Sequence, residues 1–150
     1  KQIGKMTLAS AHQSIDECGK AENILVEVLK ESPNNPIALN NLGYLYLESG
    51  KNFQEAVELI NKAIKIDPRN PSYLDSLGWA YYKLEEFKKA ETYLVKAARY
   101  DSSSATILEH LGDVYKKMGD NNAAKESWKK ALLHTSNSSD SKRINQKLAR

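Results

Sequence analysis

The chain has 150 residues, of which 41% are hydrophobic and 27% charged, and its formal net charge is +3. This composition is typical of one soluble domain, and Lys, Glu or Asn interrupt the apolar stretches too often for a segment that spans a bilayer. The single cysteine, Cys18, excludes an internal disulfide.

A sequence pattern recurs with a period of 34 residues, and one turn carries an extra residue. A Leu-Gly pair occurs at 42–43, 77–78 and 111–112, and each pair is followed by two alanines seven residues apart: Ala56 and Ala63, Ala90 and Ala97, Ala124 and Ala131. A fixed period in this range indicates a stack of similar supersecondary units. Such stacks present an extended concave surface, so the period favours binding over catalysis.

In chain order, the pattern predicts one domain with a degenerate unit at 2–35, three clear units at 36–70, 71–104 and 105–138, and a capping helix at 139–150. Apolar residues at helical spacing flank a short turn in each clear unit, which predicts two antiparallel helices per unit. In the capping helix, Ile144 and Leu148 share one face that would cover the apolar end of the stack.

The turns and joints support these boundaries. Gly50 is expected to be left-handed at the end of one helix, and Asn52 is expected to cap the next. Pro36 and Pro71 suit the first turn of a helix. In the third unit Glu85 stands where the other turns have glycine, and this costs on the order of 1 kcal/mol if the residue is left-handed.

These positions give a strong resemblance to the tetratricopeptide repeat (TPR) family, whose signature is a large residue followed by Leu-Gly, Tyr, Ala, a large apolar residue, Ala and Pro. In the 36–70 unit the matching residues are Leu39, Leu42, Gly43, Tyr46, Ala56, Ile60, Ala63 and Pro68. The resemblance implies an all-α fold, a right-handed α-α superhelix (TPR solenoid) of antiparallel helix pairs. The wording of the repeats resembles that of bacterial TPR proteins, and cytoplasm and periplasm both remain open.

The resemblance also implies a partner groove lined by the first helix of each pair. Carried over position by position, it selects Asn40, Tyr44, Leu47, Asp75, Trp79, Tyr82, Glu109 and Asp113. The aromatic rings would anchor an apolar segment, because Trp and Tyr dominate binding hot spots. The carboxylates would favour basic residues beside that segment. The alternative is that the rings pack between helices and complete the core.

Several other functions are not favoured. Some TPR domains bind the acidic C-termini of chaperones through a clamp of cations and asparagines, but the corresponding positions here hold Asn40, Tyr44, Ser76, Thr106 and His110, which include no Lys or Arg. His12, His110 and His134 lie in different units without ligands at metal spacing. His110 lies on a first helix and could face the groove, but we favour the interpretation as a partly exposed helix histidine. No phosphate-binding loop or nucleophile motif is present, so we predict no enzyme activity, cofactor or metal.

The charge is distributed unevenly, since Lys116–Arg150 holds nine Lys or Arg against Asp120, Glu126 and Asp140. Solvated helix faces are the simplest interpretation. The alternative is a surface for nucleic acid or anionic lipid, although a net charge of +3 does not favour a nucleic-acid partner.

The sequence therefore predicts a non-catalytic interaction module or scaffold that holds a peptide or a segment of a partner protein in its concave groove. The alternative function is a structural spacer or a self-assembly element that forms homo-oligomers within a larger complex.

Overall fold

The computed structural model describes residues 17–150. This part of the chain is helical throughout and contains no strand: α2 (Cys18–Glu31), α3 (Pro36–Glu48), α4 (Phe53–Ile66), α5 (Pro71–Lys83), α6 (Phe87–Tyr100), α7 (Ala105–Lys117), α8 (Asn121–His134) and α9 (Ser138–Leu148). The part of the degenerate unit at 2–16, including His12, lies outside the described residues.

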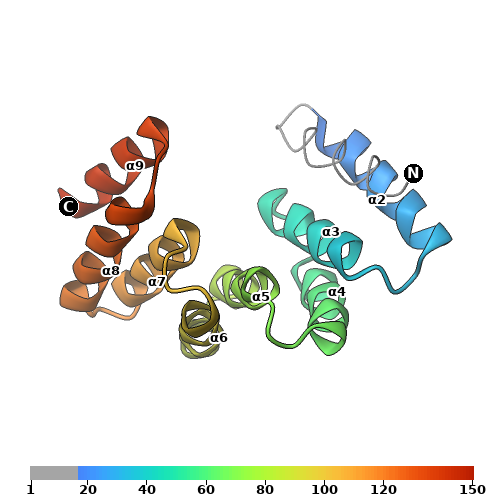
Figure 1. Cartoon of the computed structure of the whole chain (residues 1–150), viewed down its shortest axis with the longest axis horizontal. Helices are drawn as coiled ribbons and strands as arrows, with labels where there is room; N and C mark the ends of the chain where they lie inside the picture. The colour runs from blue at the N-terminus through green and yellow to red at the C-terminus, as the bar shows by residue number, and fades with distance from the viewer. Residues whose placement is uncertain (1–16) are drawn as a thin grey trace.

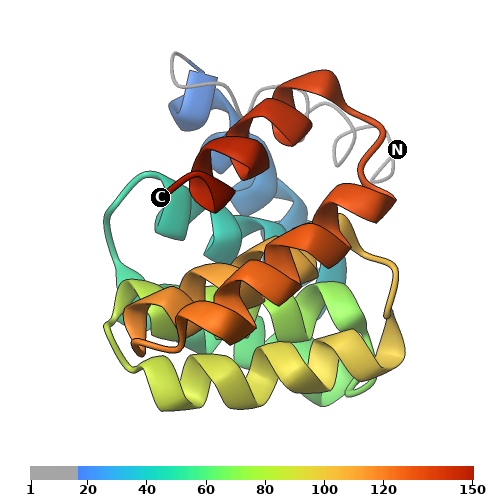
Figure 2. The ribbon, with the colours of Figure 1, turned by 90° about the vertical axis from the view of Figure 1, so that its left-hand side faces the viewer.

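The helices form an arch (Figure 1). Helices α3, α5 and α7 line its inner side, α4 and α6 lie on its outer side, and α2 and α9 lie at opposite ends. The strongest packing is within the pairs α3 and α4, α5 and α6, and α7 and α8, while each second helix also contacts the first helix of the next pair. Figure 2 views the arch from its C-terminal end, where α9 lies across the stack. The predicted all-α TPR solenoid of helix pairs is confirmed.

The predicted helix starts follow from local chemistry. Pro36 and Pro71 each occupy the first position of a helix, where a missing N–H costs nothing. The side chains of Asn35 and Asn70 accept hydrogen bonds from the first backbone N–H groups of α3 and α5. Ser104 does the same for α7, with Ile107 as the donor.

The turns within the pairs confirm one prediction and correct another. Gly50 and Gly119 are left-handed, with φ of 72° and 85°, and Glu85 adopts the same conformation at φ 60° despite its side chain. The sequence suggested that the side chain of Asn52 caps α4, but this side chain makes no capping hydrogen bond. Its own backbone is left-handed, with φ 56°. This turn is one residue longer than the others and contains two left-handed residues, Gly50 and Asn52.

Small residues allow the two helices of a pair to approach closely. All six repeated alanines are fully buried. A Cβ added to Gly112 would lie 2.3 Å from the indole of Trp128, and one added to Gly78 would lie 2.6 Å from Leu94. The Leu-Gly pair is therefore a packing requirement: the glycine receives the large side chain of the second helix.

Candidate functional site

A cavity of about 360 Å³ opens on the inner side of the arch. It is lined from α3, α5, α7 and α9 by Tyr44, Glu48, Trp79, Thr106, Glu109, His110, Asp113, Asp140, Arg143 and Lys147. We call it the inner cavity. Four of the eight residues predicted for the groove, Tyr44, Trp79, Glu109 and Asp113, lie together in its wall.

The indole of Trp79 is the centre of this wall. It stacks in parallel on the ring of Tyr82, with centroids 4.4 Å apart, and on the imidazole of His110 at 4.0 Å. Its Nε1 donates a hydrogen bond to Glu48, 3.2 Å away on α3. The rings thus satisfy both interpretations of the sequence: they pack between neighbouring helices, and Trp79 still reaches the cavity.

Two other residues predicted for the groove, Tyr82 and Leu47, lie in different surroundings. Tyr82 lines a neighbouring cavity of about 160 Å³ together with Asp113 and Lys147. Leu47, which was predicted to face the groove, is only 1% exposed and belongs to the same core cluster as Leu77 and Ala80 of α5. Its apolar side chain gains more from this burial than from exposure in the groove, so Leu47 is a core residue.

Asn40 and Asp75 are buried and do not line the inner cavity. The Asp75 carboxylate lies 2.8 Å from Nδ1 of His110, and this pair joins α5 to α7. His110 is therefore buried, not partly exposed as the sequence suggested. Burial alone would lower its pKa, but the charge and hydrogen bond of Asp75 outweigh burial and raise the pKa above its usual value. Asn40 donates to Asn41, and its Oδ1 has no hydrogen-bond partner within residues 17–150.

Helix α9 contributes two cations that the sequence pattern did not assign to the groove. Arg143 donates two hydrogen bonds to Glu109, from Nε at 2.8 Å and from a terminal nitrogen at 2.7 Å. Lys147 donates to Glu109 at 2.7 Å and to Asp113 at 2.9 Å. A usable signal existed, because Arg143 follows Glu109, and Lys147 follows Asp113, by one repeat length of 34 residues.

These contacts change the electrostatics of the groove. Burial would raise the pKa of Glu109, but hydrogen bonds from Arg143 and Lys147 lower it to about 2. Burial, followed by the charges of Glu48 and Asp75, raises the pKa of Tyr44, so its hydroxyl stays neutral. The acidic positions predicted to attract a basic partner are thus already paired within the chain, as is Asp140 with Arg143, whereas Glu48 accepts a hydrogen bond from Trp79.

Within residues 17–150 no cluster of His, Cys, Asp or Glu has the arrangement of a metal site. The same residues contain no helix long and apolar enough to cross a membrane.

Comparison with known proteins finds family models and solved structures that match this chain. Models described as tetratricopeptide repeat match residues 19–80, 71–104 and 105–133. A comparison with curated protein sequences finds no significant match.

Three solved structures illustrate the fold similarity. A thermophilic TPR protein of Thermus thermophilus, TTC0263, has a TM-score of 0.87 and 21% identity over 100% of this chain and 84% of that one. Pseudomonas aeruginosa pilF has a TM-score of 0.79 and 22% identity over 97% of this chain and 68% of that one. The APC/C hetero-tetramer Cut9-Hcn1 has a TM-score of 0.82 and 16% identity, covering all of this chain and 30% of its counterpart. Together with the family matches, the paired helices and their Leu-Gly contacts show that the chain belongs to the tetratricopeptide repeat family.

Proposed function

We propose that this TPR protein is a non-catalytic interaction module that holds a segment of a partner protein in the inner cavity. The observation that carries the proposal is the position of Trp79, which is partly exposed in a concave wall built from four helices. A large aromatic ring in such a place can bury more surface only when a partner covers it. The TPR fold is a general protein-interaction scaffold, which supports the same conclusion.

The chemistry of the cavity defines the partner. Tyr44 and Trp79 provide apolar contact area, and Glu48 provides a carboxylate that accepts a hydrogen bond from Trp79. We therefore infer a segment with an apolar side chain for the aromatic wall and a basic residue beside Glu48. Glu109, Asp113 and Asp140 are paired with Arg143 or Lys147 of α9, so Glu48 is the carboxylate of the cavity that has no ion-pair partner within residues 17–150.

A peptide-library selection tests this proposal. Thr106→Arg should abolish enrichment, because Thr106 is exposed on α7 and lines the inner cavity, where a long cation would obstruct the peptide. Ser72→Arg is the matched control, because Ser72 is exposed at the same position of α5 but does not line the cavity. Enrichment of apolar and basic peptides by the wild type and Ser72→Arg, but not by Thr106→Arg, is the expected result.

The selection should also be repeated with the Trp79→Ala/Tyr82→Ala variant after its fold has been checked by circular dichroism. A folded double variant is expected to lose the same peptides. If Thr106→Arg and the double variant enrich peptides as the wild type does, the segment binds elsewhere and the proposal is wrong.

One observation favours self-association as a second function. Leu133 on α8 is 80% exposed, whereas the equivalent residues of the earlier units are Lys30, Lys65 and Arg99. A single exposed leucine is common on protein surfaces, but here it replaces the cation of the equivalent positions, and contact with another copy of the chain would cover Leu133. Leu133→Lys restores the pattern, and it should remove any concentration-dependent shift in sedimentation. A wild type that sediments as a monomer at all concentrations would exclude this function.

A further inference from the structure

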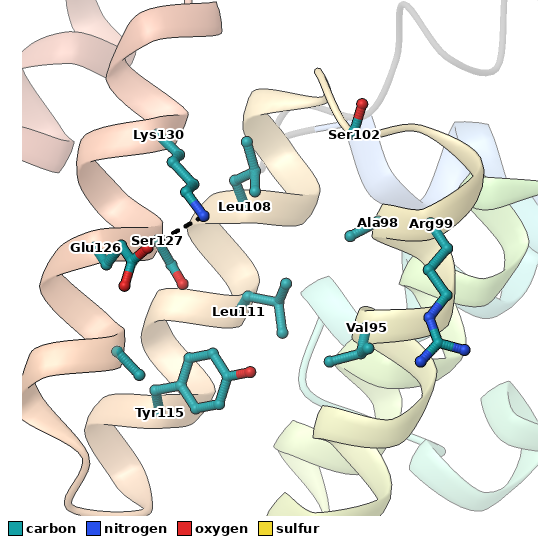
Figure 3. A pocket seen from close by; sticks show the side chains of 11 residues that line it. Val95, Ala98, Arg99, Ser102, Leu108, Leu111, Tyr115, Glu126, Ser127 and Lys130 are labelled. Atoms are coloured by element: carbon teal, nitrogen blue, oxygen red, sulfur yellow. Dashed lines mark ion pairs between the residues drawn. The ribbon is translucent and has the colours of Figure 1, made fainter.

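The outer side of the arch contains a second cavity, between α6 and α8 (Figure 3). Its volume is about 420 Å³, within the range of roughly 300–1,000 Å³ typical of ligand sites. Leu108, Leu111 and Tyr115 of α7 form its floor, and Val95 and Ala98 of α6 form one wall. Ser127 of α8 forms the opposite wall. We call this space the outer cavity.

The outer cavity arises because two repeated positions change from large to small residues. At the first junction between second helices these positions hold Leu29 and Leu59, and at the next junction they hold Ile64 and Tyr93. Both pairs pack in the hydrophobic core. At the α6–α8 junction the same positions hold Ala98 and Ser127.

At the α6–α8 junction this change leaves the outer cavity, which is lined mainly by apolar side chains and is open to solvent. Apolar surface that stays exposed to water does not gain the free energy of burial, so covering it is favourable. The small residues Ala98 and Ser127 therefore leave unfilled the space that Ile64 and Tyr93 fill at the previous junction. A site that receives a side chain from outside would recover that packing on binding.

The rim of the outer cavity indicates the charge of the occupant. Glu126 and Lys130 form an ion pair of 3.3 Å with both side chains more than half exposed. Arg99 lies on the opposite side of the cavity and has no ion-pair partner among the contacts of residues 17–150. A further cavity on α6, of about 480 Å³, shares Val95 and Arg99 and adds Glu91, Thr92, Lys96 and Tyr100. Glu91 forms an ion pair with Lys88. The surface around the opening therefore carries uncompensated positive charge.

We propose that the outer cavity binds a partner segment that inserts one large apolar or aromatic side chain and places a carboxylate beside Arg99. Charge complementarity selects this occupant over a basic segment, and the depth between α6 and α8 selects a bulky side chain over a small one. This surface lies on the outer side of the arch, so its occupant differs from the segment proposed for the inner cavity.

The test uses the whole ¹⁵N-labelled chain and the peptide acetyl-Glu-Trp-Glu-amide. Saturable NMR shifts are expected at the amides of Ala98 and Ser127. The peptides acetyl-Glu-Ala-Glu-amide and acetyl-Lys-Trp-Lys-amide should bind more weakly, because the first lacks the ring and the second has the wrong charge. Arg99→Gln should weaken binding of the first peptide by roughly two- to fivefold, as expected for an exposed ion pair.

Two filling variants restore residues that the previous junction already uses. Ser127→Tyr and Ala98→Ile should each weaken peptide binding at least tenfold while keeping or raising the melting temperature, because the added atoms occupy existing space. A large drop in melting temperature in both variants would overturn the proposal, since it would show that the space is not available.

Three other outcomes also overturn the proposal. Shifts confined to Tyr44 and Trp79 would place the peptide in the inner cavity. Equal binding by wild type and Ser127→Tyr would place it outside the outer cavity. Self-association that Ser127→Tyr abolishes would identify a second copy of the chain as the occupant.

Discussion

Replacing Arg143 with alanine should loosen α9 from the rest of the array. Only Ile144 of α9 is buried, so the helix depends on its contacts with Glu109 more than a core helix would. A hydrogen bond to a charged group contributes about 1.5–3 kcal/mol, whereas an exposed ion pair contributes roughly 0.2–1 kcal/mol. The Arg143 side chain is half exposed and makes two such bonds. The loss should therefore lie between these limits, about 1–2 kcal/mol.

In a chain of this size a loss of that magnitude lowers the melting temperature by roughly 2–8 °C. Hydrogen exchange should show the larger effect locally, with faster exchange of the α9 amides than of those in α5. Lys142→Ala is the matched control, because Lys142 is exposed on the same helix, whereas Arg143 and Lys147 make the contacts with α7. Equal exchange of α9 in the wild type and Arg143→Ala would refute the role given to this contact.

The same contact gives a pH dependence with a definite sign. The pKa of Glu109 falls from 4.5 to about 2 in the folded chain, so its contribution to stability is complete above pH 4.5 and is lost as the pH falls toward 2. As the pH falls from 4.5 toward 2, the hydrogen-exchange protection of the α9 amides should decrease, after correction for intrinsic exchange rates. Glu109→Gln should remove the dependence, and a wild-type α9 that stays equally protected at both ends of the window would contradict it.

Three further outcomes follow from the fold. Gly112→Ala should lower the free energy of unfolding by about 1–3 kcal/mol, because the new Cβ would collide with Trp128; an unchanged denaturant midpoint would show that the indole can move aside at no cost. Glu85→Gly should raise the free energy of unfolding by up to about 1 kcal/mol, since φ is 60° at this position; a lower melting temperature would refute this. His110 has a raised pKa beside Asp75, so its charged form stabilises the fold at low pH, and this contribution should fade as the pH rises above 6.5 through the folded pKa. His110→Gln should flatten the stability profile in that window, and a profile that keeps its slope would assign the titration to another group.

The sequence predicted the fold well because the TPR period is set by local packing. Pro36 begins a helix and Gly50 ends one for reasons contained within a few residues. The glycine of each Leu-Gly pair faces a large residue of the same unit, so its role is also visible in the period. Asn52 was misread because two left-handed residues in one turn depend on the extra residue there.

The site was predicted less completely because exposure in a stack depends on the neighbouring unit. The same repeat position holds Leu47 in the core, a partly buried Tyr82 in a cavity wall, and Lys116, which lines the same cavity but is exposed. The predicted set of charged groove residues was incomplete for the same reason. Helix α9 lacks the Leu-Gly signature, so the sequence indicated only a capping role for it. Its groove-facing residues, Arg143 and Lys147, became evident only when α9 was seen beside α7.

Three polar contacts at the inner cavity connect the helices of the arch along its length. Each contact joins successive inner helices: Glu48 with Trp79, Asp75 with His110, and Glu109 with Arg143. The middle contact is buried and therefore shielded from dissolved ions, whereas the last involves a half-exposed guanidinium that salt weakens. Rising ionic strength should therefore weaken the contact that holds α9 to α7 more than the contact between α5 and α7.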